Sequence, residues 1–474
     1  MTSVARLAIG TTNAETDIRP LLRALLRELT NRDLHVQCFL AHAAFTGFQE
    51  LRSWSGAVPR HLDSWLMSPQ HCRNSFVKGL RGVDVALVVG RYLCLVPAWS
   101  SIRKGNRFES RLRAAGASSG IPHTPSSDSA ELRHRDCICK TLSGGTLEPL
   151  SDWLNLTRLA VLDASQLSLG TRGNLPKDVR GVFLNNLPRE LAGRAAIETE
   201  ALWGVPLLGG VSPSVGRQQF VRRGGRSGAM LTFWDERRFL TLLDQSGSFP
   251  FPLEPGTVED FGGRITVAVA RDEAFRCYFA ETLDALERRG ARLVDFSPLH
   301  DESLPRGVDC VYLGCGNCPP YGAALAQNHC IKESLRAHVR RGGRIYAEGA
   351  GAAYLCRWME IRPGCMIPGV GLLPAAGRRM PRFGDPSALA LHLRKATWMG
   401  PAGTEVRGYR NWEWWFEPES LDSGLISEPG FEYDVIGNGT VLGSLLHLDF
   451  AAQEHLLSAF FHSAHPRPHS FTGR

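Results

Sequence analysis

Lysine is scarce in this 474-residue chain. Only six of its 54 basic residues are lysines, the first of them Lys78, so the net charge of +7 rests on arginine. The basic clusters Arg222-Arg223 and Arg340-Arg341 are short and are not interleaved with aromatic residues. Nucleic-acid sites usually show a longer basic patch or stripe. We therefore expect no nucleic-acid partner.

Long apolar runs are also missing. The chain has no stretch of about 18 apolar residues, the length that a membrane helix needs. The N-terminus, MTSVARLAIGTT, lacks a basic region, an apolar core and a cleavage site, so it predicts a first strand rather than a signal peptide. Twelve cysteines are scattered through both halves. This distribution is typical of reduced thiols and predicts a cytoplasmic protein without a membrane partner.

The N-terminal half alternates strand and helix patterns. An apolar strand at 5–10, leucines at helical spacing over 18–30 and a strand at 36–40 form a βαβ opening, which predicts a parallel sheet. Further apolar strands are predicted at 83–90, 157–165, 180–186 and 205–213, with a helix at 189–202.

A second α/β unit begins near residue 264. The unit begins with RITVAVARDEAF at 264–275. Its predicted strands are 292–298, 309–316, 344–347 and 441–450, with helices ending near 289 and spanning 323–341. We predict two domains at 1–213 and 263–464, an insertion or loop at 98–135, a linker at 214–262 and a tail at 465–474.

A tight turn of small residues, Glu348-Gly349-Ala350-Gly351, joins the strand at 344–347 to a helix. A sharp strand-to-helix bend is where an α/β enzyme can expose a nucleophile. No Ser, Thr or Cys stands in this turn. The question is whether the bend lost its nucleophile or never had one.

Nine segments, taken in order, resemble the cobyrinic acid a,c-diamide synthase family. They are LDSWLMSP at 62–69, RGVFLNN at 180–186, VPLLGGV at 205–211, VAVARDEAF at 267–275, ALERRGARLVDFSPLHDESLP at 285–305, VYLGCG at 311–316, GGRIYAE at 342–348, GLLP at 371–374 and LLHLDF at 445–450. The resemblance implies an α/β fold of two domains. The N-terminal domain is expected to be P-loop-NTPase-like, of the dethiobiotin-synthetase type. The C-terminal domain is expected to be class I glutamine-amidotransferase-like.

The resemblance also implies a reaction in two halves. A Cys–His pair hydrolyses glutamine, and ATP with Mg²⁺ activates tetrapyrrole carboxylates that ammonia converts to amides. The family turn reads A-E-C-G-G, so Gly349 stands at the nucleophile's position, while His447 stands at that of the histidine. An imidazole without its thiolate is half of a catalytic pair. We predict that glutaminase activity is absent.

The phosphate loop is altered as well. The family's G-x-G-K-T-T run corresponds here to GTTNAETDIRP at 10–20, with Asp17 near the lysine position. The family's acid-Gly pair after strand four is replaced by Val89-Gly90, which offers no carboxylate to a hard cation. Asp63 and Asn185 are retained as nucleotide-site candidates, although both also suit the capping of loops. No cofactor is expected, although the family uses ATP and Mg²⁺.

A tryptophan-rich run replaces the family's G-H-E-F-H segment. Trp412, Trp414 and Trp415 could stack on a macrocycle or a partner protein, or could be core and edge-strand aromatics. Cys315 and Cys318 form an isolated CxxC, which is weak evidence for a metal or redox site.

The leading hypothesis is a catalytically degenerate relative of the diamide synthase. It would act as a binding or assembly subunit, with a tetrapyrrole ligand or an active relative as partner, and could form a homodimer. A divergent amide ligase and a thiol metal or redox module are the alternatives.

Overall fold

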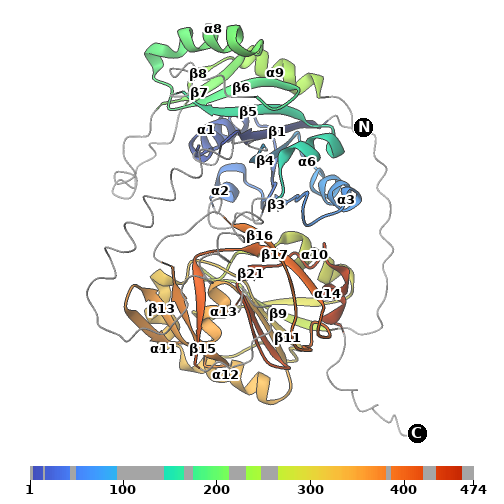
Figure 1. Ribbon diagram of the computed structural model, residues 1–474, viewed down its shortest axis with the longest axis vertical. Helices are drawn as coiled ribbons and strands as arrows, with labels where there is room; N and C mark the ends of the chain where they lie inside the picture. The colour runs from blue at the N-terminus through green and yellow to red at the C-terminus, as the bar shows by residue number, and fades with distance from the viewer. Residues whose placement is uncertain are drawn as a thin grey trace, which may run out of the picture.

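Two α/β halves follow one another along the chain (Figure 1). The computed structural model describes residues 4–13, 16–42, 50–92, 144–164, 175–212, 231–246, 265–380, 386–419 and 434–461. The predicted insertion at 98–135 and the predicted tail at 465–474 lie outside the described residues. Among the described helices, none combines the length and the apolar character that a bilayer crossing requires.

The N-terminal half is built on one eight-stranded sheet with the order β3-β2-β4-β1-β5-β6-β7-β8. All its neighbouring pairs are parallel except β7 with β8. Its strands are β1 (Ala5–Thr11), β2 (Val36–Leu40), β3 (Arg60–His61), β4 (Val85–Arg91), β5 (Thr157–Asp163), β6 (Val179–Asn185), β7 (Leu207–Val211) and β8 (Leu231–Trp234).

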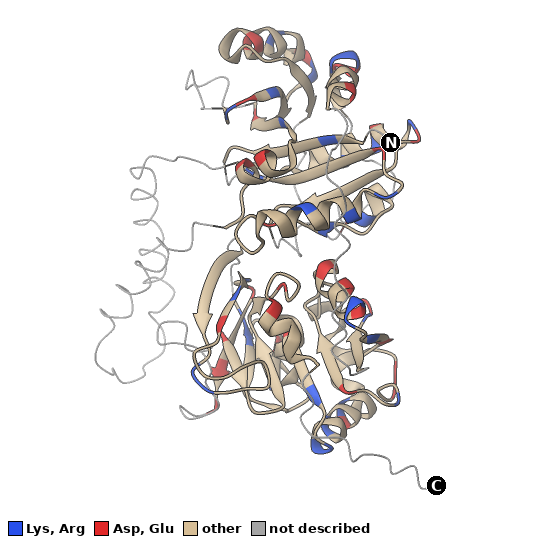
Figure 2. Ribbon diagram, turned by 90° about the vertical axis from the view of Figure 1, so that its right-hand side faces the viewer, with Lys and Arg blue, Asp and Glu red and all other residues tan. Residues whose placement is uncertain are grey.

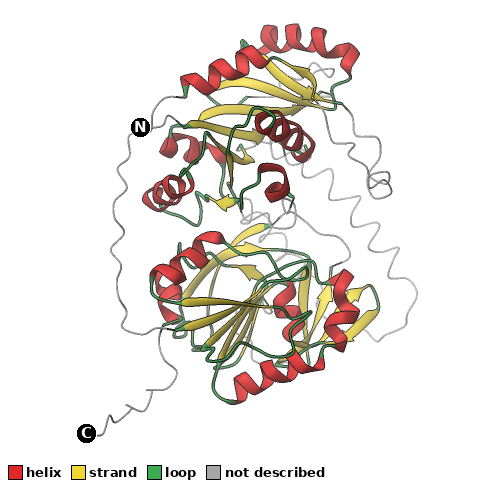
Figure 3. Ribbon diagram, turned by 180° about the vertical axis from the view of Figure 1, so that it is seen from behind, coloured by secondary structure: helices red, strands yellow, loops and turns green. Residues whose placement is uncertain are grey.

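Helices cover both faces of this sheet (Figure 3). They are α1 (Arg19–Thr30), α2 (Leu51–Ser55), α3 (Pro69–Gly79), α6 (Leu147–Leu154), η1 (Arg189–Leu191), α8 (Ala192–Trp203) and α9 (Glu236–Gln245). In β1, Leu7 and Ile9 pack in the cluster that holds α1 and α9, while Ala8 packs with α3 and α6. The alternation of side chains along a strand explains this two-sided core.

The C-terminal half has a central sheet ordered β10-β9-β11-β12-β20-β19. Two smaller sheets, β14-β13-β15-β18 and β16-β17-β21, complete it. Its strands are β9 (Thr266–Ala270), β10 (Arg292–Phe296), β11 (Cys310–Leu313), β12 (Arg344–Glu348), β13 (Cys356–Arg362), β14 (Cys365–Pro368), β15 (Leu373–Arg379), β16 (Ser387–His392), β17 (Glu405–Arg410), β18 (Trp414–Pro418), β19 (Val435–Gly437), β20 (Val441–Ser444) and β21 (Leu446–His447).

The helices of this half again lie on two sides of the central sheet. They are α10 (Ala280–Arg288), η2 (Pro319–Tyr321), α11 (Gly322–Gln327), α12 (His329–Arg340), α13 (Ala350–Leu355) and α14 (Glu454–Ala459). Buried residues of α11, α12 and α13 share one core cluster with β14-β13-β15-β18, and those of α10 and α14 share another with β16-β17-β21. The predicted α/β fold of two parallel-sheet domains is confirmed.

Three predicted elements differ from the structure. The single helix predicted at 323–341 is interrupted at Asn328, whose backbone leaves the helical region and whose side chain caps α12. The strand predicted at 441–450 divides into β20 and β21, which belong to different sheets. The predicted linker at 214–262 contains β8 and α9, which extend the N-terminal sheet beyond residue 213.

Charged groups join the two halves at one interface. Arg60 of β3 contacts Glu281 at 3.1 Å and Asp284 at 2.8 Å, and the Lys78 ammonium lies 2.5 Å from Asp284. Elsewhere, acidic and basic positions are interspersed over the described parts of both halves (Figure 2). The buried side chain of Glu281 also lies near Asp449 in the C-terminal half. Two carboxylates therefore share a dry environment at this interface.

Replacing Asp449 with asparagine is expected to stabilise the protein more at about pH 8 than at about pH 5. Burial, and then the charge of Glu281, raises the pKa of the Asp449 carboxyl from 3.8 to about 7. Because the pKa of Asp449 is higher in the folded than in the unfolded protein, ionisation of this carboxyl lowers the free energy of unfolding. The loss grows as the pH rises from 3.8 to about 7 and has its full size above that range. The melting temperature should gain about 5 °C more at the higher pH.

The matched control is Asp295→Asn, since Asp295 lies at the surface, where it pairs with Arg271. It should show no comparable pH-dependent gain. An equal shift of the Asp449→Asn protein at both pH values would contradict the prediction.

Candidate functional site

The strand-to-helix turn is present and has the backbone of a sharp bend. β12 ends at Glu348, α13 begins at Ala350, and Gly349 between them has φ 51° and ψ −114°. A side chain at Gly349 would begin 3.1 Å from Cβ of Cys315 and 3.1 Å from Cε1 of His447. The turn therefore directs position 349 at the histidine that the sequence singled out. The structure therefore places positions 349 and 447 next to each other.

A buried carboxylate orients that histidine. His447 Nδ1 lies 3.3 Å from Oε2 of Glu348, and both side chains are fully buried. The other oxygen of Glu348 accepts hydrogen bonds from the Leu448 amide and from the hydroxyls of Tyr346 and Tyr312. With Nδ1 directed at Glu348, Nε2 lies 3.5 Å from where a Cβ at Gly349 would be. The imidazole is thus set to face a nucleophile that the turn does not carry.

Cys315 fills space beside the turn. It forms an isolated antiparallel bridge with Cys277, whose amide donates to the Cys315 carbonyl at 3.0 Å. Burial, followed by the neighbouring Cys277 thiol, raises the pKa of the Cys315 thiol well above its ordinary value. Thiolates, not thiols, are the nucleophilic form. Cys315 is therefore a buried neutral thiol rather than a replacement nucleophile.

The CxxC pair does not converge on one point. The Cys318 thiol donates to the Ala274 carbonyl at 3.6 Å inside the core, while Cys315 faces Cys277. Among the described residues, no three His, Cys, Asp or Glu side chains are grouped so as to hold a metal ion.

The residues of the predicted phosphate loop form a different local structure. The Asp17 carboxylate pairs with the Arg19 guanidinium at 2.7 Å and accepts from the Arg19 amide at 3.1 Å, at the first turn of α1. Asn185, at the end of β6, donates to the Asp17 carbonyl at 2.6 Å. The N-terminus of α1 thus already faces an anion supplied by the chain. The structure thus brings Asp17 and Asn185 together.

Asp63 lies elsewhere, at the junction of the two halves. Its Oδ1 accepts from the amides of Trp65 at 2.8 Å and Leu66 at 2.9 Å, and its Oδ2 accepts from the Tyr409 hydroxyl. Burial raises the pKa of Asp63 to about 6, although these hydrogen bonds lower it. The Tyr409 hydroxyl also accepts from the Gly145 amide at 2.8 Å. The geometry favours the capping role that the sequence left open for Asp63.

The three tryptophans do not form one surface, which corrects the prediction of a joint contact. Trp414 is buried in the core, because β18 alternates its side chains between two faces. Trp412 is half-buried, donates to the Ser387 hydroxyl at 3.0 Å and lies under the Arg410 guanidinium. Trp415 alone is exposed, at 39%.

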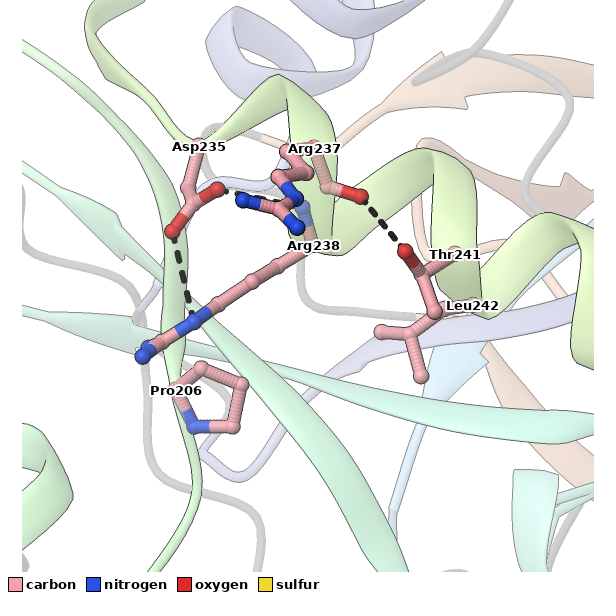
Figure 4. A pocket seen from close by; sticks show the side chains of 6 residues that line it. All are labelled: Pro206, Asp235, Arg237, Arg238, Thr241 and Leu242. Carbon is pink, nitrogen blue, oxygen red and sulfur yellow. Dashed lines mark hydrogen bonds and ion pairs between the residues drawn. The ribbon is translucent and has the colours of Figure 1, made fainter.

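A cavity of about 480 Å³ lies far from the turn, beside α9 (Figure 4). Asp235 caps α9 and lies 3.6 Å from Nε of Arg238, which also contacts Glu200 at 3.3 Å. Arg238, one of the two arginines that line the cavity, is thus engaged by carboxylates of the chain. None of the residues predicted from sequence lines this cavity.

Sequence reasoning missed Glu348 and Tyr409 as site residues. Glu348 was visible in the turn motif, next to Gly349, but nothing in the sequence revealed its contact with His447. Tyr409 pairs with His447 across β17 and β21, a register that residue spacing does not predict.

Comparisons with known proteins agree with this architecture. The family model of the CobB/CobQ-like glutamine amidotransferase domain matches residues 266–413, which include Gly349 and end before His447. Cobyrinate a,c-diamide synthase of Syntrophotalea carbinolica is 28% identical over 439 residues, 86% of this chain and 85% of the relative. That of Leptospira interrogans is 23% identical over 97% of this chain and 98% of its own length.

The chain belongs to the cobyrinate a,c-diamide synthase family. A solved glutamine amidotransferase is 21% identical, with a TM-score of 0.31, and covers 41% of this chain and 98% of its own. The alignments to these synthases span both halves, so the family assignment is not limited to the amidotransferase domain.

Replacing Tyr409 with phenylalanine is expected to destabilise the protein by about 1–3 kcal/mol, because the buried Asp63 carboxylate would lose a hydroxyl donor. Denaturant unfolding would measure the loss. The matched control is Tyr354→Phe, since the buried Tyr354 hydroxyl has no hydrogen-bond partner among the described residues. Equal effects of the two changes would show that the Tyr409–Asp63 contact contributes nothing.

Proposed function

We propose that this chain is a cobyrinate a,c-diamide synthase-like protein of cobalamin biosynthesis that has lost catalysis and acts as a binding or assembly subunit. The observation that carries the proposal is Gly349. The turn, the histidine and its orienting carboxylate are all in place, yet position 349 has no side chain. A covalent thioester cannot form without a nucleophile at this point.

The crowding of the turn supports the same conclusion. Cys315, whose Cβ would lie 3.1 Å from a Cβ at position 349, is 3% exposed, and His447 is buried. Gly351 approaches the carbonyls of Leu313 and Gly314, so the backbone on this side is closely packed. Glutamine hydrolysis needs room for the substrate amide and for oxyanion donors around it.

The described part of the phosphate loop does not fit a magnesium triphosphate. A carboxylate, Asp17, occupies the N-terminus of α1, where phosphate oxygens would need N–H donors and positive charge. The strand end at Val89-Gly90 offers no oxygen ligand from a side chain. We therefore infer that ATP and Mg²⁺, which the family reaction requires, are not cofactors of this chain.

The retained function would be recognition. A tetrapyrrole or an active relative is the proposed partner, because both domains of the family fold are kept while Gly349 and Asp17 stand at the positions of the nucleophile and of the phosphate-loop lysine. Cys38, Cys310 and Cys356 are buried free thiols, which suits the reducing cytoplasm as the proposed location.

A divergent amide ligase is the second candidate, favoured by the buried Glu348–His447 pair. A histidine that acts as a general base is usually held in place by a hydrogen bond to one of its ring nitrogens. The thiol metal or redox module keeps weaker support, because Cys315 and Cys318 face different neighbours. Product analysis after incubation with glutamine, ATP, Mg²⁺ and a tetrapyrrole acid separates the ligase from the binding subunit.

The purified protein is expected to release no glutamate from glutamine. Gly349→Cys alone should restore little, because the new side chain would meet Cys315 at 3.1 Å. The double change Gly349→Cys with Cys315→Gly removes that contact and should give the larger rate of the two. A coupled glutamate assay would measure all three proteins.

His447→Ala serves as the control for contaminating glutaminase. Glutamate release by the unmodified protein that disappears in His447→Ala would contradict the proposed loss of catalysis. Release that persists in His447→Ala would come from a contaminant, which repurification removes.

Calorimetry with Mg-ATP is expected to show a dissociation constant at least about 100-fold weaker than a functional phosphate loop. The loss of two charge-assisted contacts, each worth about 1.5–3 kcal/mol, accounts for this factor. Asp17→Asn should strengthen any residual binding by removing a negative charge from the N-terminus of α1. Micromolar affinity in the unmodified protein would refute the prediction.

A further inference from the structure

The sheet β14-β13-β15-β18 presents one face to the core and the other to solvent. On the inner face, the buried Met359, Ala375, Trp414 and Phe416 pack in the cluster that contains α13. Figure 1 shows α13 between β15 and the central strands β9 and β11. The outer face of the sheet carries Trp358 and Trp415, which are 46% and 39% exposed.

Strand register places these two tryptophans on the same face. Trp358 pairs with Ala376, and Arg378, two residues further along β15, pairs with Trp415. Directly paired residues and residues two apart share a face of a sheet. Among the described tryptophans, only these two are classed as exposed. Large aromatic side chains left in solvent on one face indicate an interaction surface rather than chance exposure.

A groove lies on the same face. It has a volume of about 470 Å³ and is lined by Trp358, Met366, Ala376, Arg378, Glu417, Pro418 and Glu419. Trp415 is not one of its lining residues but lies next to it, opposite Arg378. An exposed aromatic side chain therefore stands beside a groove lined by both apolar and charged residues. A two-fold axis between them would seat the aromatic side chain of each copy in the groove of the other.

The charges of this face are balanced. Arg378 pairs with Glu417 at 2.6 Å, and Arg357 pairs with Glu419 at 3.1 Å. These pairs are solvent-exposed and weak, so they can exchange partners at little cost. A face with equal numbers of neighbouring cations and anions is complementary to a copy of itself. A strongly acidic or basic partner would instead require an excess of one sign.

We propose that two copies of this chain associate through the outer face of β14-β13-β15-β18, with Trp415 of each copy inserted into the groove of the other. The interface is isologous, so every contact occurs twice. Tryptophan anchors in apolar pockets with arginine–carboxylate pairs around them are the usual centre of such interfaces. The inference does not depend on the proposed loss of catalysis, because the assembly state is measured without substrate.

Sedimentation equilibrium of the full chain over a concentration series tests the interface. The unmodified protein should be a dimer, and Trp415→Ala and Trp358→Ala should each weaken dimerisation by at least about tenfold. The control is Ile197→Ala on α8, which removes a 73% exposed apolar side chain from the other half and should leave the dimer unchanged. A monomer at all concentrations, or a dimer insensitive to both tryptophan changes, would overturn the proposal.

Charge reversal gives a test that does not depend on core packing. Arg378→Glu and Glu417→Arg should each weaken self-association, because each change replaces the Arg378–Glu417 pair with two neighbouring like charges on both copies, beside the retained Arg357–Glu419 pair. An equimolar mixture of the two variants should form a heterodimer, detected by native mass spectrometry. Undiminished self-association of both variants, or a mixture that remains monomeric while the unmodified chain dimerises, would exclude this face as the interface.

Discussion

Tyr409 links the N-terminal half of the molecule to the turn at Gly349 and to His447. The backbone of Tyr409 pairs with that of His447, and the Tyr409 hydroxyl contacts Asp63 and the Gly145 amide in the N-terminal half. A buried carboxylate such as Asp63 is tolerated only when donors surround it. The tyrosine and two backbone amides provide them. The position of β17, and with it of β21 and the histidine, therefore depends on a contact made in the other half.

Glu348 has a similar role within the C-terminal half. It gathers an amide, two tyrosine hydroxyls and His447 around one buried carboxylate. Removing any member would leave a polar group unsatisfied in the core, at a cost independent of catalysis. The positions of the bend and of His447 are therefore fixed by this network without a side chain at position 349. Gly349 has no side chain in this network, and its positive φ is adopted by glycine with less backbone strain than by other residues.

The sequence was informative where apolar periodicity dictates structure. The strands at 36–40 and 180–186 and the helix at 18–30 were predicted within one or two residues, because their burial pattern is continuous. The break at Asn328 was missed because a capping side chain within a periodic run does not change the hydrophobic pattern. The pairing of positions 349 and 447 followed from the family resemblance, not from spacing. The Asp63–Tyr409 contact joins residues 346 positions apart and left no local signal.

The tryptophan-rich segment shows why residue type alone does not define a surface. In β18, successive side chains point to opposite faces, so Trp414 is required by the core while Trp415 is left outside. Trp358 reaches the same outer face from a strand more than 50 positions earlier in the chain, through the register of β13 with β15. Core packing fixes this register, since Met359 and Ala375 must face α13. The strand register that buries Trp414 therefore also aligns the exposed Trp358 and Trp415. Because both stand on a rigid sheet, the backbone entropy lost in any association through this face is small.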